Sequence, residues 1–463
     1  MAVFSVIKLS ELEGAKQLAP EFYHPAKIVS KRYLENAGSK RIKDCFYNVR
    51  EIFDPKNKRL TREGIVFDLS DVTSYFLYGG KKVTSSEEVG SAKKIFFEND
   101  VLISRLRPYL KEVSFIGFNE KLKLASTEFV VLRQKDKNYY PETLFAYLIS
   151  KEVQNILAWS ITGTEHPRFN EDYFLKLTLP NFSEETQKKI KTIVQSAWKI
   201  FLDSLELYSQ AETLLLEELG FKNFKPRYEK TYTANLSSAF SAHRIDAEYF
   251  QPAYEEIIEK IKKYQGGFDK LLNHVENVKP DFDPTKYPDQ TFYYIELADI
   301  DSSIGVVHSV NKIKGYEAPS RARRLLREND VIVSSVEGSL EKLALIDKEH
   351  DGCLASTGFF QFRPLDILPE VLLVLSKTIV LQSQLKKRCS GTILSAVPKE
   401  SLRDIVIPLL PPSIQQKIAS LVQQSHEARK KAKELLEIAK KAVEIAIEKN
   451  EKEALDYILK VQT

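Results

Sequence analysis

The chain carries an internal duplication whose two copies match at an offset of 227 to 230 residues. Residues 98–116 (ENDVLISRLRPYLKEVSFI) align without a gap with residues 328–346 (ENDVIVSSVEGSLEKLALI). At the same offset, residues 125–133 (ASTEFVVLR) match residues 355–363 (ASTGFFQFR). Because the matches keep one order along the chain, chance similarity is excluded. The repeat predicts two similar domains rather than one large fold.

Further matches extend the repeat in both directions. PEFYHPA at 20–26 matches AEYFQPA at 247–253, and LTLP at 177–180 matches IVIP at 405–408. Each copy contains short β-branched runs, such as VLISRL and VIVSSV, that predict strands. Residues 144–158 carry the apolar spacing of a helix. Each copy is therefore predicted to be a mixed α/β (α+β) domain.

A long helix is predicted after each copy. The first spans residues 183–220 and would be roughly 57 Å long. Sustained heptad patterning favours a coiled-coil pairing of the two helices, whereas the alternative is that each helix packs only on its own domain. The predicted seam of the first helix is Ile190, Val194, Ala197, Phe201, Ser204, Tyr208, Ala211 and Leu215. That of the second is Leu421, Ser425, Ala428, Ala432, Leu435, Ala439, Ala442 and Ala446.

The predicted organisation has five parts. They are a first domain (1–182), a long helix (183–220), a linker (221–242), a second domain (243–410), and a second long helix with a tail (411–463). The tail from residue 447 either continues the helix or folds back.

Composition excludes several classes of protein. Hydrophobic residues make up 43% and charged residues 29% of the chain, as in globular proteins. No apolar run approaches the ~20 residues that cross a bilayer, and the first residues do not resemble a secretory signal. Cys45, Cys353 and Cys389 are far apart, which favours a reducing cytoplasm over disulfides or a zinc site.

Taken together, the duplicated motifs resemble the specificity subunit of type I restriction–modification enzymes. The motifs are the END-V strand, the AST strand, a small Gly-Thr turn and the LP…QxxI helix entry. The resemblance runs from about Pro20 to Ala446. It implies two target recognition domains related by a pseudo-two-fold axis, each recognising one half of an asymmetric, bipartite DNA target. The two helices would form an antiparallel coiled coil that separates the domains.

The resemblance also implies partners. Two copies of an adenine methyltransferase (modification) subunit would dock on the helices and use S-adenosylmethionine. Restriction subunits driven by ATP and magnesium would complete a nuclease complex. The chain itself would bind double-stranded DNA and hold no cofactor or metal.

In the first copy, Arg105 and Arg107 alternate near a strand end, which predicts that both side chains point to one face. Arginine can donate to phosphate oxygens or to guanine, and Tyr109 follows closely. The alternative is that both arginines bridge carboxylates such as Glu128. The second copy has Ser335 and Glu337 at the arginine positions, so its contacts must lie elsewhere.

Four further groups are candidate DNA contacts. The first domain offers a lysine group that flanks a Gly/Ser/Thr-rich loop, and a loop at 162–168 with small residues and polar donors. The second domain offers an arginine cluster and the counterpart of that loop. The alternatives are solvated charged loops and a histidine that only caps a turn. The residues are Lys81, Lys82, Lys93, Lys94; Thr162, Gly163, Thr164, His166, Arg168; Arg321, Arg323, Arg324, Arg327; and Ser390, Gly391, Thr392.

Net charge does not decide whether the chain binds DNA. Residues 21–182 contain 26 basic and 21 acidic residues, a net charge of +5, whereas residues 243–410 contain 22 and 25, a net charge of −3. Phosphate attraction acts through local potential, so the prediction rests on the local clusters.

Catalytic motifs are missing. The sequence has no G-x-x-x-x-G-K-[ST] loop, no H-E-x-x-H, no Asn-Pro-Pro-aromatic motif and no two glycines spaced as G-x-G. A non-catalytic recognition subunit is therefore expected. A coiled-coil scaffold that binds only proteins is the alternative, and salt-sensitive binding to duplex DNA would separate the two.

Overall fold

The computed structural model describes residues 4–13, 18–117, 122–391 and 395–462. The chain divides into two compact units: unit 1 holds residues 1–201 and 430–463, and unit 2 holds residues 202–429. Each of the two long helices therefore contributes one segment to each unit. Within the described residues, no helix combines the length and the apolarity that crossing a membrane requires.

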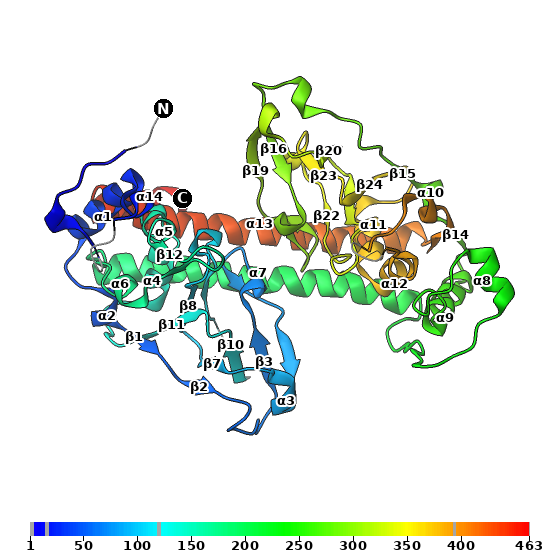
Figure 1. The fold of residues 1–463 in the computed structure, drawn as a ribbon, viewed down its shortest axis with the longest axis horizontal. Helices are drawn as coiled ribbons and strands as arrows, with labels where there is room; N and C mark the ends of the chain where they lie inside the picture. Colours follow the sequence, from blue (N-terminus) through cyan, green and yellow to red (C-terminus); the bar gives the residue numbers. More distant parts are fainter. Residues whose placement is uncertain (1–3, 14–17, 118–121, 392–394, 463) are drawn as a thin grey trace. The chain divides into compact units, whose positions relative to one another are not determined.

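Two main sheets form the described globular part of unit 1 (Figure 1). The first has the antiparallel order β1-β11-β8-β9, and the second has the order β2-β7-β10-β3-β6, in which β10 and β3 run parallel. The strands of the first sheet are β1 (Phe46–Val49), β8 (Val101–Ser104), β9 (Val113–Phe115) and β11 (Phe129–Gln134). Those of the second are β2 (Ile52–Phe53), β3 (Gly64–Phe67), β6 (Lys81–Val83), β7 (Lys93–Phe96) and β10 (Leu122–Ala125). A separate short antiparallel pair, β4 (Val72–Thr73) and β5 (Phe76–Leu77), lies between β3 and β6 in the sequence.

Unit 2 repeats this topology. Its sheets have the orders β15-β24-β21-β22 and β19-β16-β23-β20, again with one parallel pair, β16 and β23. The strands are β15 (Val275–Asn277), β21 (Val331–Ser334), β22 (Leu343–Leu345), β24 (Phe359–Pro364), β16 (Thr291–Ile295), β19 (Asn311–Lys314), β20 (Ala322–Leu325) and β23 (Leu354–Ser356). The short pairs are β17 (Ile300–Asp301) with β18 (Val306–Val307), and β14 (Phe268–Lys270) with β25 (Val406–Pro408). The predicted duplication is therefore a duplication of strand order, with β2 as an addition in unit 1.

The repeated Asn-Asp pair makes the turn that starts β8 and β21. Asn99 and Asn329 adopt left-handed backbone angles, with φ of +64° and +70°, which asparagine tolerates better than most residues. The aspartate that follows is buried and accepts two hydrogen bonds from an arginine on the neighbouring strand. Arg133 donates to Asp100 at 2.9 and 2.7 Å, and Arg363 donates to Asp330 at 2.9 and 3.0 Å. This duplicated motif is structural.

Helices cover the sheets in each unit. The helix predicted over 144–158 is two helices, because Ser150 interrupts it and donates its hydroxyl to the Tyr147 carbonyl at 2.6 Å. Thr378 interrupts the corresponding helix of unit 2 in the same way. Unit 1 has α1 (Pro25–Ala37), α2 (Ile42–Cys45), α3 (Ser86–Val89), α4 (Pro141–Leu148), α5 (Lys151–Ala158) and α6 (Glu171–Phe174). Unit 2 has α8 (Leu236–Ala242), α9 (Pro252–Lys262), α10 (Leu271–His274), α11 (Pro369–Lys377) and α12 (Ile379–Arg388).

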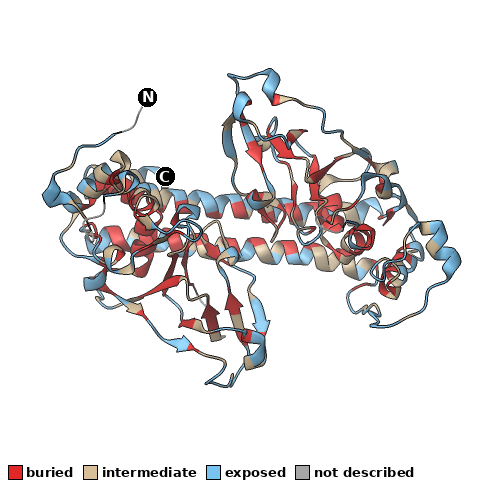
Figure 2. Cartoon of the chain, viewed as in Figure 1, coloured by how far each residue is buried: buried red, intermediate tan, exposed pale blue. Residues whose placement is uncertain are grey.

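The long helices are α7 (Glu184–Glu218) and α13 (Pro412–Glu448). Figure 2 shows buried positions recurring along both helices between exposed ones. All eight residues of the predicted α7 seam are buried, including Ser204. In unit 2 the Ser204 carbonyl accepts from Ser425 Oγ at 2.6 Å, while Leu215, farther along α7, shares a core with Ile418 and Val422. The two helices therefore run in opposite directions where they pair in unit 2.

The predicted α13 seam is partly wrong. Leu421, Ala428 and Leu435 are only half-buried, and the buried positions are Ile418, Val422, Ser425, Arg429, Ala432, Leu436, Ala439, Val443 and Ala446. Ala442 is buried as well. The true seam is the α7 seam moved by 228 residues, so that Arg429 occupies the position of Phe201. A charged residue is rarely buried, but here the Arg429 guanidinium is paired with the Asp301 carboxylate.

The tail forms a separate helix, α14 (Glu451–Gln462). Asn450 lies between α13 and α14 and accepts from the Glu453 amide at 3.0 Å, which caps the new helix. Ala454 and Ile458 of α14 are fully buried in unit 1, and Glu451 accepts from the Ser183 hydroxyl at 2.6 Å. The tail is therefore an integral part of unit 1.

Candidate nucleic-acid interface

The loop predicted at 162–168 is the tip of a β-hairpin in unit 1. Strand β12 (Ile161–Thr162) pairs with β13 (Arg168–Phe169). Gly163 has a φ of +94°, which glycine adopts without strain. The five residues from Thr162 to His166 are exposed. The hairpin thus presents a small polar tip to solvent.

Backbone bonds join this hairpin to the segment that follows β8. The Arg107 amide donates to the Pro167 carbonyl at 2.8 Å, and the Phe169 amide donates to the Arg105 carbonyl at 3.1 Å. The prediction that Arg105 and Arg107 alternate on one strand face is wrong, because β8 ends at Ser104 and Arg107 has a left-handed φ of +47°. Arg107 is exposed, and its guanidinium lies 3.5 Å from the Glu165 carbonyl.

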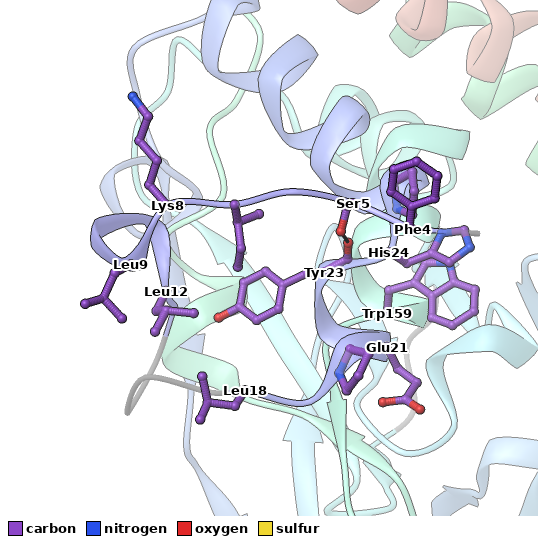
Figure 3. Close-up of a pocket in the computed structure, with 13 residues that line it drawn as sticks. Phe4, Ser5, Lys8, Leu9, Leu12, Leu18, Glu21, Tyr23, His24 and Trp159 are labelled. Atoms are coloured by element: carbon purple, nitrogen blue, oxygen red, sulfur yellow. Dashed lines mark hydrogen bonds between the residues drawn. The ribbon is translucent and has the colours of Figure 1, made fainter. Parts of the chain in front are cut away.

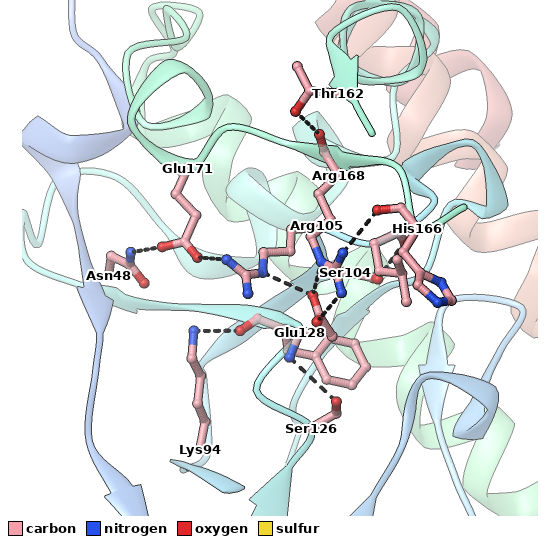
Figure 4. A network of polar contacts seen from close by, with 12 residues as sticks. Asn48, Lys94, Ser104, Arg105, Ser126, Glu128, Thr162, His166, Arg168 and Glu171 are labelled. Atoms are coloured by element: carbon pink, nitrogen blue, oxygen red, sulfur yellow. Dashed lines mark hydrogen bonds and ion pairs between the residues drawn. The ribbon is translucent and has the colours of Figure 1, made fainter. Parts of the chain in front are cut away.

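A cluster of charged side chains lies under the hairpin (Figure 4). Glu128 accepts from Arg168 at 2.7 and 2.9 Å and from Arg105 Nε at 3.0 Å. Arg105 also donates to Glu171 at 3.2 Å, and Glu171 accepts from Asn48 at 3.0 Å. We call these five residues the Glu128 cluster. For Arg105 the structure favours the alternative interpretation, in which the arginine bridges carboxylates.

The charges of the cluster stabilise one another. The hydrogen bond from Arg168, and then that from Arg105, lowers the pKa of the Glu128 carboxyl, although partial burial opposes the shift. Arg168 also donates through Nη1 to the His166 carbonyl at 2.9 Å. The cluster therefore connects the carboxylate of Glu128 to the backbone of the hairpin tip.

The four predicted lysines differ in exposure. Lys81 and Lys82 are exposed on β6, and Lys93 is half-buried and donates to Ser91 Oγ at 3.0 Å. Lys94 is buried and donates to the Phe129 carbonyl at 2.7 Å, and burial lowers the pKa of its ammonium group. The prediction of a phosphate contact at Lys94 is therefore wrong. Tyr109 is 47% exposed.

The arginine cluster of unit 2 also divides. Arg321 and Arg327 are exposed, whereas Arg323 pairs with Asp283 at 2.9 Å. Arg324 is buried on the opposite side of β20, where it donates to the Val278 carbonyl at 2.7 Å, and burial lowers its pKa to about 10. The prediction of a DNA contact at Arg324 is therefore wrong. Strand alternation carries its side chain inward, as at Lys94, which is the same position of the repeat.

The second copy keeps the backbone of the hairpin junction. The Glu337 amide donates to the Ser395 carbonyl at 2.9 Å, and the Val397 amide donates to the Ser335 carbonyl at 2.8 Å. Ser390 and Gly391 are exposed, and Thr392 lies outside the described residues. The residues that correspond to Arg105, Glu128 and Arg168 are Ser335, Gly358 and Ala396, none of which carries a charge.

One basic segment was not singled out from the sequence. Four exposed basic residues follow β2 in the loop before β3: Lys56, Lys58, Arg59 and Arg62. Ser86 of α3 holds the loop, accepting from the Leu60 amide at 2.7 Å and donating to the Lys58 carbonyl at 3.1 Å. Four basic residues within seven positions would have been a sufficient signal.

A hollow of unit 1 lies elsewhere. It has a volume of about 770 Å³ and is lined by the N-terminal segment and Trp159, on which the His24 ring stacks at 3.9 Å (Figure 3). None of the predicted contact residues lines it. In the parts of the chain that the structure describes, no three His, Cys, Asp or Glu side chains are arranged to hold a metal ion.

Comparison with known proteins agrees with the predicted resemblance. No family model matches the chain. The specificity subunit of the type I restriction enzyme HindI of Haemophilus influenzae is 32% identical over 139 residues, which are 29% of this chain and 29% of that protein. The chain is similar to type I specificity subunits. The match spans less than a third of the relative's length.

Two solved structures are also similar. The HsdS subunit from Thermoanaerobacter tengcongensis is 18% identical, covering 89% of this chain and 96% of that one, with a TM-score of 0.33. The S subunit of a type I restriction–modification system from M. genitalium is 12% identical, covering 88% and 94%, with a TM-score of 0.39.

Proposed function

We propose that the chain is the DNA sequence-specificity subunit of a type I restriction–modification complex, in which each domain recognises one half of a bipartite, asymmetric target. The observation that carries the proposal is the hairpin junction. Both copies use the same backbone bonds to join an exposed turn to the same strand end, yet the side chains around that turn differ. A constant framework with variable polar groups suits two readers of different sequences.

The hairpin is a two-stranded element with an exposed polar tip, which suits base recognition. The major groove of B-DNA admits a two-stranded β-ribbon, and its base edges offer donors and acceptors. In unit 1, Thr164, His166 and Arg107 are exposed at the tip or beside it. In unit 2 the described part of the tip offers Ser390 and Gly391. We assign base contacts to these two tips.

Phosphate contacts supply affinity without sequence information. Lys81, Lys82 and Lys93 would serve this role in unit 1, together with the exposed loop that contains Arg59 and Arg62. Arg321 and Arg327 would serve it in unit 2. Each neutralised phosphate releases counterions, so affinity should fall steeply with salt.

The catalytic partners are assigned by the same proposal. Two adenine methyltransferase subunits would supply S-adenosylmethionine chemistry, and restriction subunits would supply ATP and magnesium, while this chain catalyses nothing. Two identical partners need two similar docking regions. The join between domain and long helix is repeated: Gln195 donates to Glu142 at 2.7 Å, and Gln423 donates to Glu370 at 2.6 Å. This repetition supports binding of the same subunit twice.

Co-expression with the methyltransferase subunit encoded beside the gene tests the proposal. Adenine methylation mapped across the host DNA should show a split, asymmetric motif only when both proteins are present. An assembled pair that leaves no new methylation would refute the proposal and favour a protein-binding scaffold.

A further inference from the structure

Glu128 and the two arginines that contact it are all replaced by uncharged residues in the second copy. Arg105, Glu128 and Arg168 of the first copy correspond to Ser335, Gly358 and Ala396 of the second. Removing the carboxylate alone would leave two guanidinium groups close together without their shared counter-charge. The joint loss of all three charges is therefore what we expect if the three residues act together.

Glu128 itself is engaged by protein groups. Its two oxygens accept three hydrogen bonds from Arg105 and Arg168, out of about four that an ionised carboxylate can accept. Only 20% of its side chain is exposed. A carboxylate can accept from the cytosine amino group, but this one is held beneath the hairpin by two arginines. Its role in recognition must be indirect.

The hydrogen bonds lead from Glu128 to the hairpin tip. Arg168 donates to Glu128 with two nitrogens and to the His166 carbonyl with the third, at 2.9 Å. Arg105 ties the same carboxylate to Glu171 at the start of α6. The backbone of the tip is thus fixed while the side chains of Thr164 and His166 remain exposed.

We infer that Glu128 is a positioning residue for the hairpin tip, and that base discrimination in the first half-site depends on this residue although it does not touch DNA. The inference rests on the proposed function of the hairpin. A tip held in its binding geometry loses less conformational freedom on binding and adapts poorly to a wrong base. Because Gly358 replaces Glu128 in unit 2, the second half-site is an internal control.

The experiment uses the full chain in complex with its methyltransferase partner. Duplexes carry the target mapped by methylation, or that target with one base pair changed in either half-site, and dissociation constants are measured across a range of salt concentrations. In Glu128→Gln, discrimination in the first half-site should fall about tenfold, roughly the contribution of one base pair. Discrimination in the second half-site should stay within about twofold of the wild type.

A second readout separates positioning from simple unfolding. In Glu128→Gln, Arg168 loses its carboxylate and becomes available to phosphates, whereas Arg105 keeps its ion pair with Glu171, so non-specific affinity should rise and the salt dependence should steepen by up to about one counterion. Glu128→Asp keeps the charge and should recover part of the discrimination. The triple variant Arg105→Ser, Glu128→Gly, Arg168→Ala replaces the three charged residues with their uncharged counterparts from unit 2. It should lose discrimination in the first half-site without a steeper salt dependence.

Asp136→Asn is the matched control, because it removes an exposed ion pair with Lys40 in the same unit. It should leave both half-sites unchanged. Unchanged discrimination in Glu128→Gln, or an equal loss in both half-sites, would overturn the inference while the wild-type target still supports the proposed function. A wild-type complex without any sequence preference would overturn both.

Discussion

Each long helix packs against the globular domain of its unit at corresponding positions, but the contact is apolar in unit 1 and ionic in unit 2. In unit 1, Phe201 of α7 stacks on Phe76 with ring centroids 4.1 Å apart, and Trp198 packs against both rings. Gly117 makes room for the indole, since a Cβ there would lie 2.0 Å from Trp198 Nε1. The contact is a close-packed aromatic cluster.

In unit 2 the same helix positions carry Arg429 and His426. The buried Arg429 guanidinium pairs with the buried Asp301 carboxylate and donates to Ser204 Oγ at 3.0 Å. His426 donates from Nε2 to the Ile304 carbonyl at 2.8 Å. One backbone framework thus accepts an apolar or an ionic junction, provided that each buried charge finds a partner. The two junctions should respond differently to mutation and pH.

Phe201→Ala should have the largest effect on stability. Removing a buried aromatic ring costs about 4 kcal/mol, from lost burial and the cavity that remains. The loss should be confined to unit 1, as measured by urea unfolding together with hydrogen exchange of α7 peptides. Equal deprotection of the α9–α12 peptides of unit 2 would contradict separate junctions.

Asp301→Ala should cost unit 2 about 3 kcal/mol, because it leaves the Arg429 guanidinium buried without its carboxylate. The double variant Asp301→Ala, Arg429→Leu should recover most of this loss, since neither charge then remains. Urea unfolding of the wild type, the two single variants (Asp301→Ala and Arg429→Leu) and the double variant measures the coupling between the two residues. Additive effects in the double variant would show that the ion pair does not govern this junction.

His426 should make unit 2 sensitive to mild acid. Burial, followed by the nearby Arg429 charge, lowers the pKa of His426 below its usual 6.5, although part of its side chain remains accessible. Since the unfolded chain binds the proton more tightly, the contribution of neutral His426 to the free energy of unfolding is fully present above about pH 6.5. It is lost as pH falls toward the folded pKa, by at most about 1.4 kcal/mol per pH unit.

The measurement is hydrogen exchange of α13 peptides between pH 7.5 and 5, corrected for intrinsic rates. His426→Gln should flatten this dependence, and the Trp198 junction of unit 1 provides the non-titrating reference. A pH response that persists in His426→Gln would assign it to another group.

The smallest expected effect is on non-specific DNA binding, and it tests the difference in net charge between the first domain (+5) and the second (−3). Arg59→Gln with Arg62→Gln should weaken non-specific DNA binding and make the salt dependence shallower by up to about two counterions. Base discrimination in either half-site should not change, because phosphate contacts carry no sequence information. Lys279→Gln with Lys286→Gln is the matched pair, because both lysines are exposed in the corresponding segment of unit 2, between β15 and β16. A loss of discrimination in the first half-site would instead place the Arg59 loop near the bases.

Several predictions from sequence depended only on local or repeated patterns, and these agree with the structure. The offset of the repeat anticipated the matching strand orders, and the heptad spacing located all eight buried positions of α7. The same offset would have corrected the α13 seam, because it maps Phe201 onto Arg429. The predicted α13 seam did not include Arg429, although the repeat places it at the position of a buried residue.

The polar site was less accessible to sequence reasoning. The hairpin was located as a loop, but Arg105 was assigned to DNA or to a carboxylate without a basis for choosing. Its partners Glu128 and Glu171 lie 23 and 66 residues away along the chain. Lys94 and Arg324 were predicted as DNA contacts because each lies in a local cluster of basic residues. Each is buried where a backbone carbonyl accepts its donor.

The sequence by itself determined the duplication, the mixed α/β class, the two long helices and the stripe that α7 buries, because these follow from periodicity and from order along the chain. Only the tertiary structure decided which charged residues face solvent and which face one another. Arg168, Glu128 and Arg105 come together through strand pairing and the packing of α6, and no local pattern encodes that meeting. Whether a guanidinium is free for DNA depends on whether folding has already given it a carboxylate.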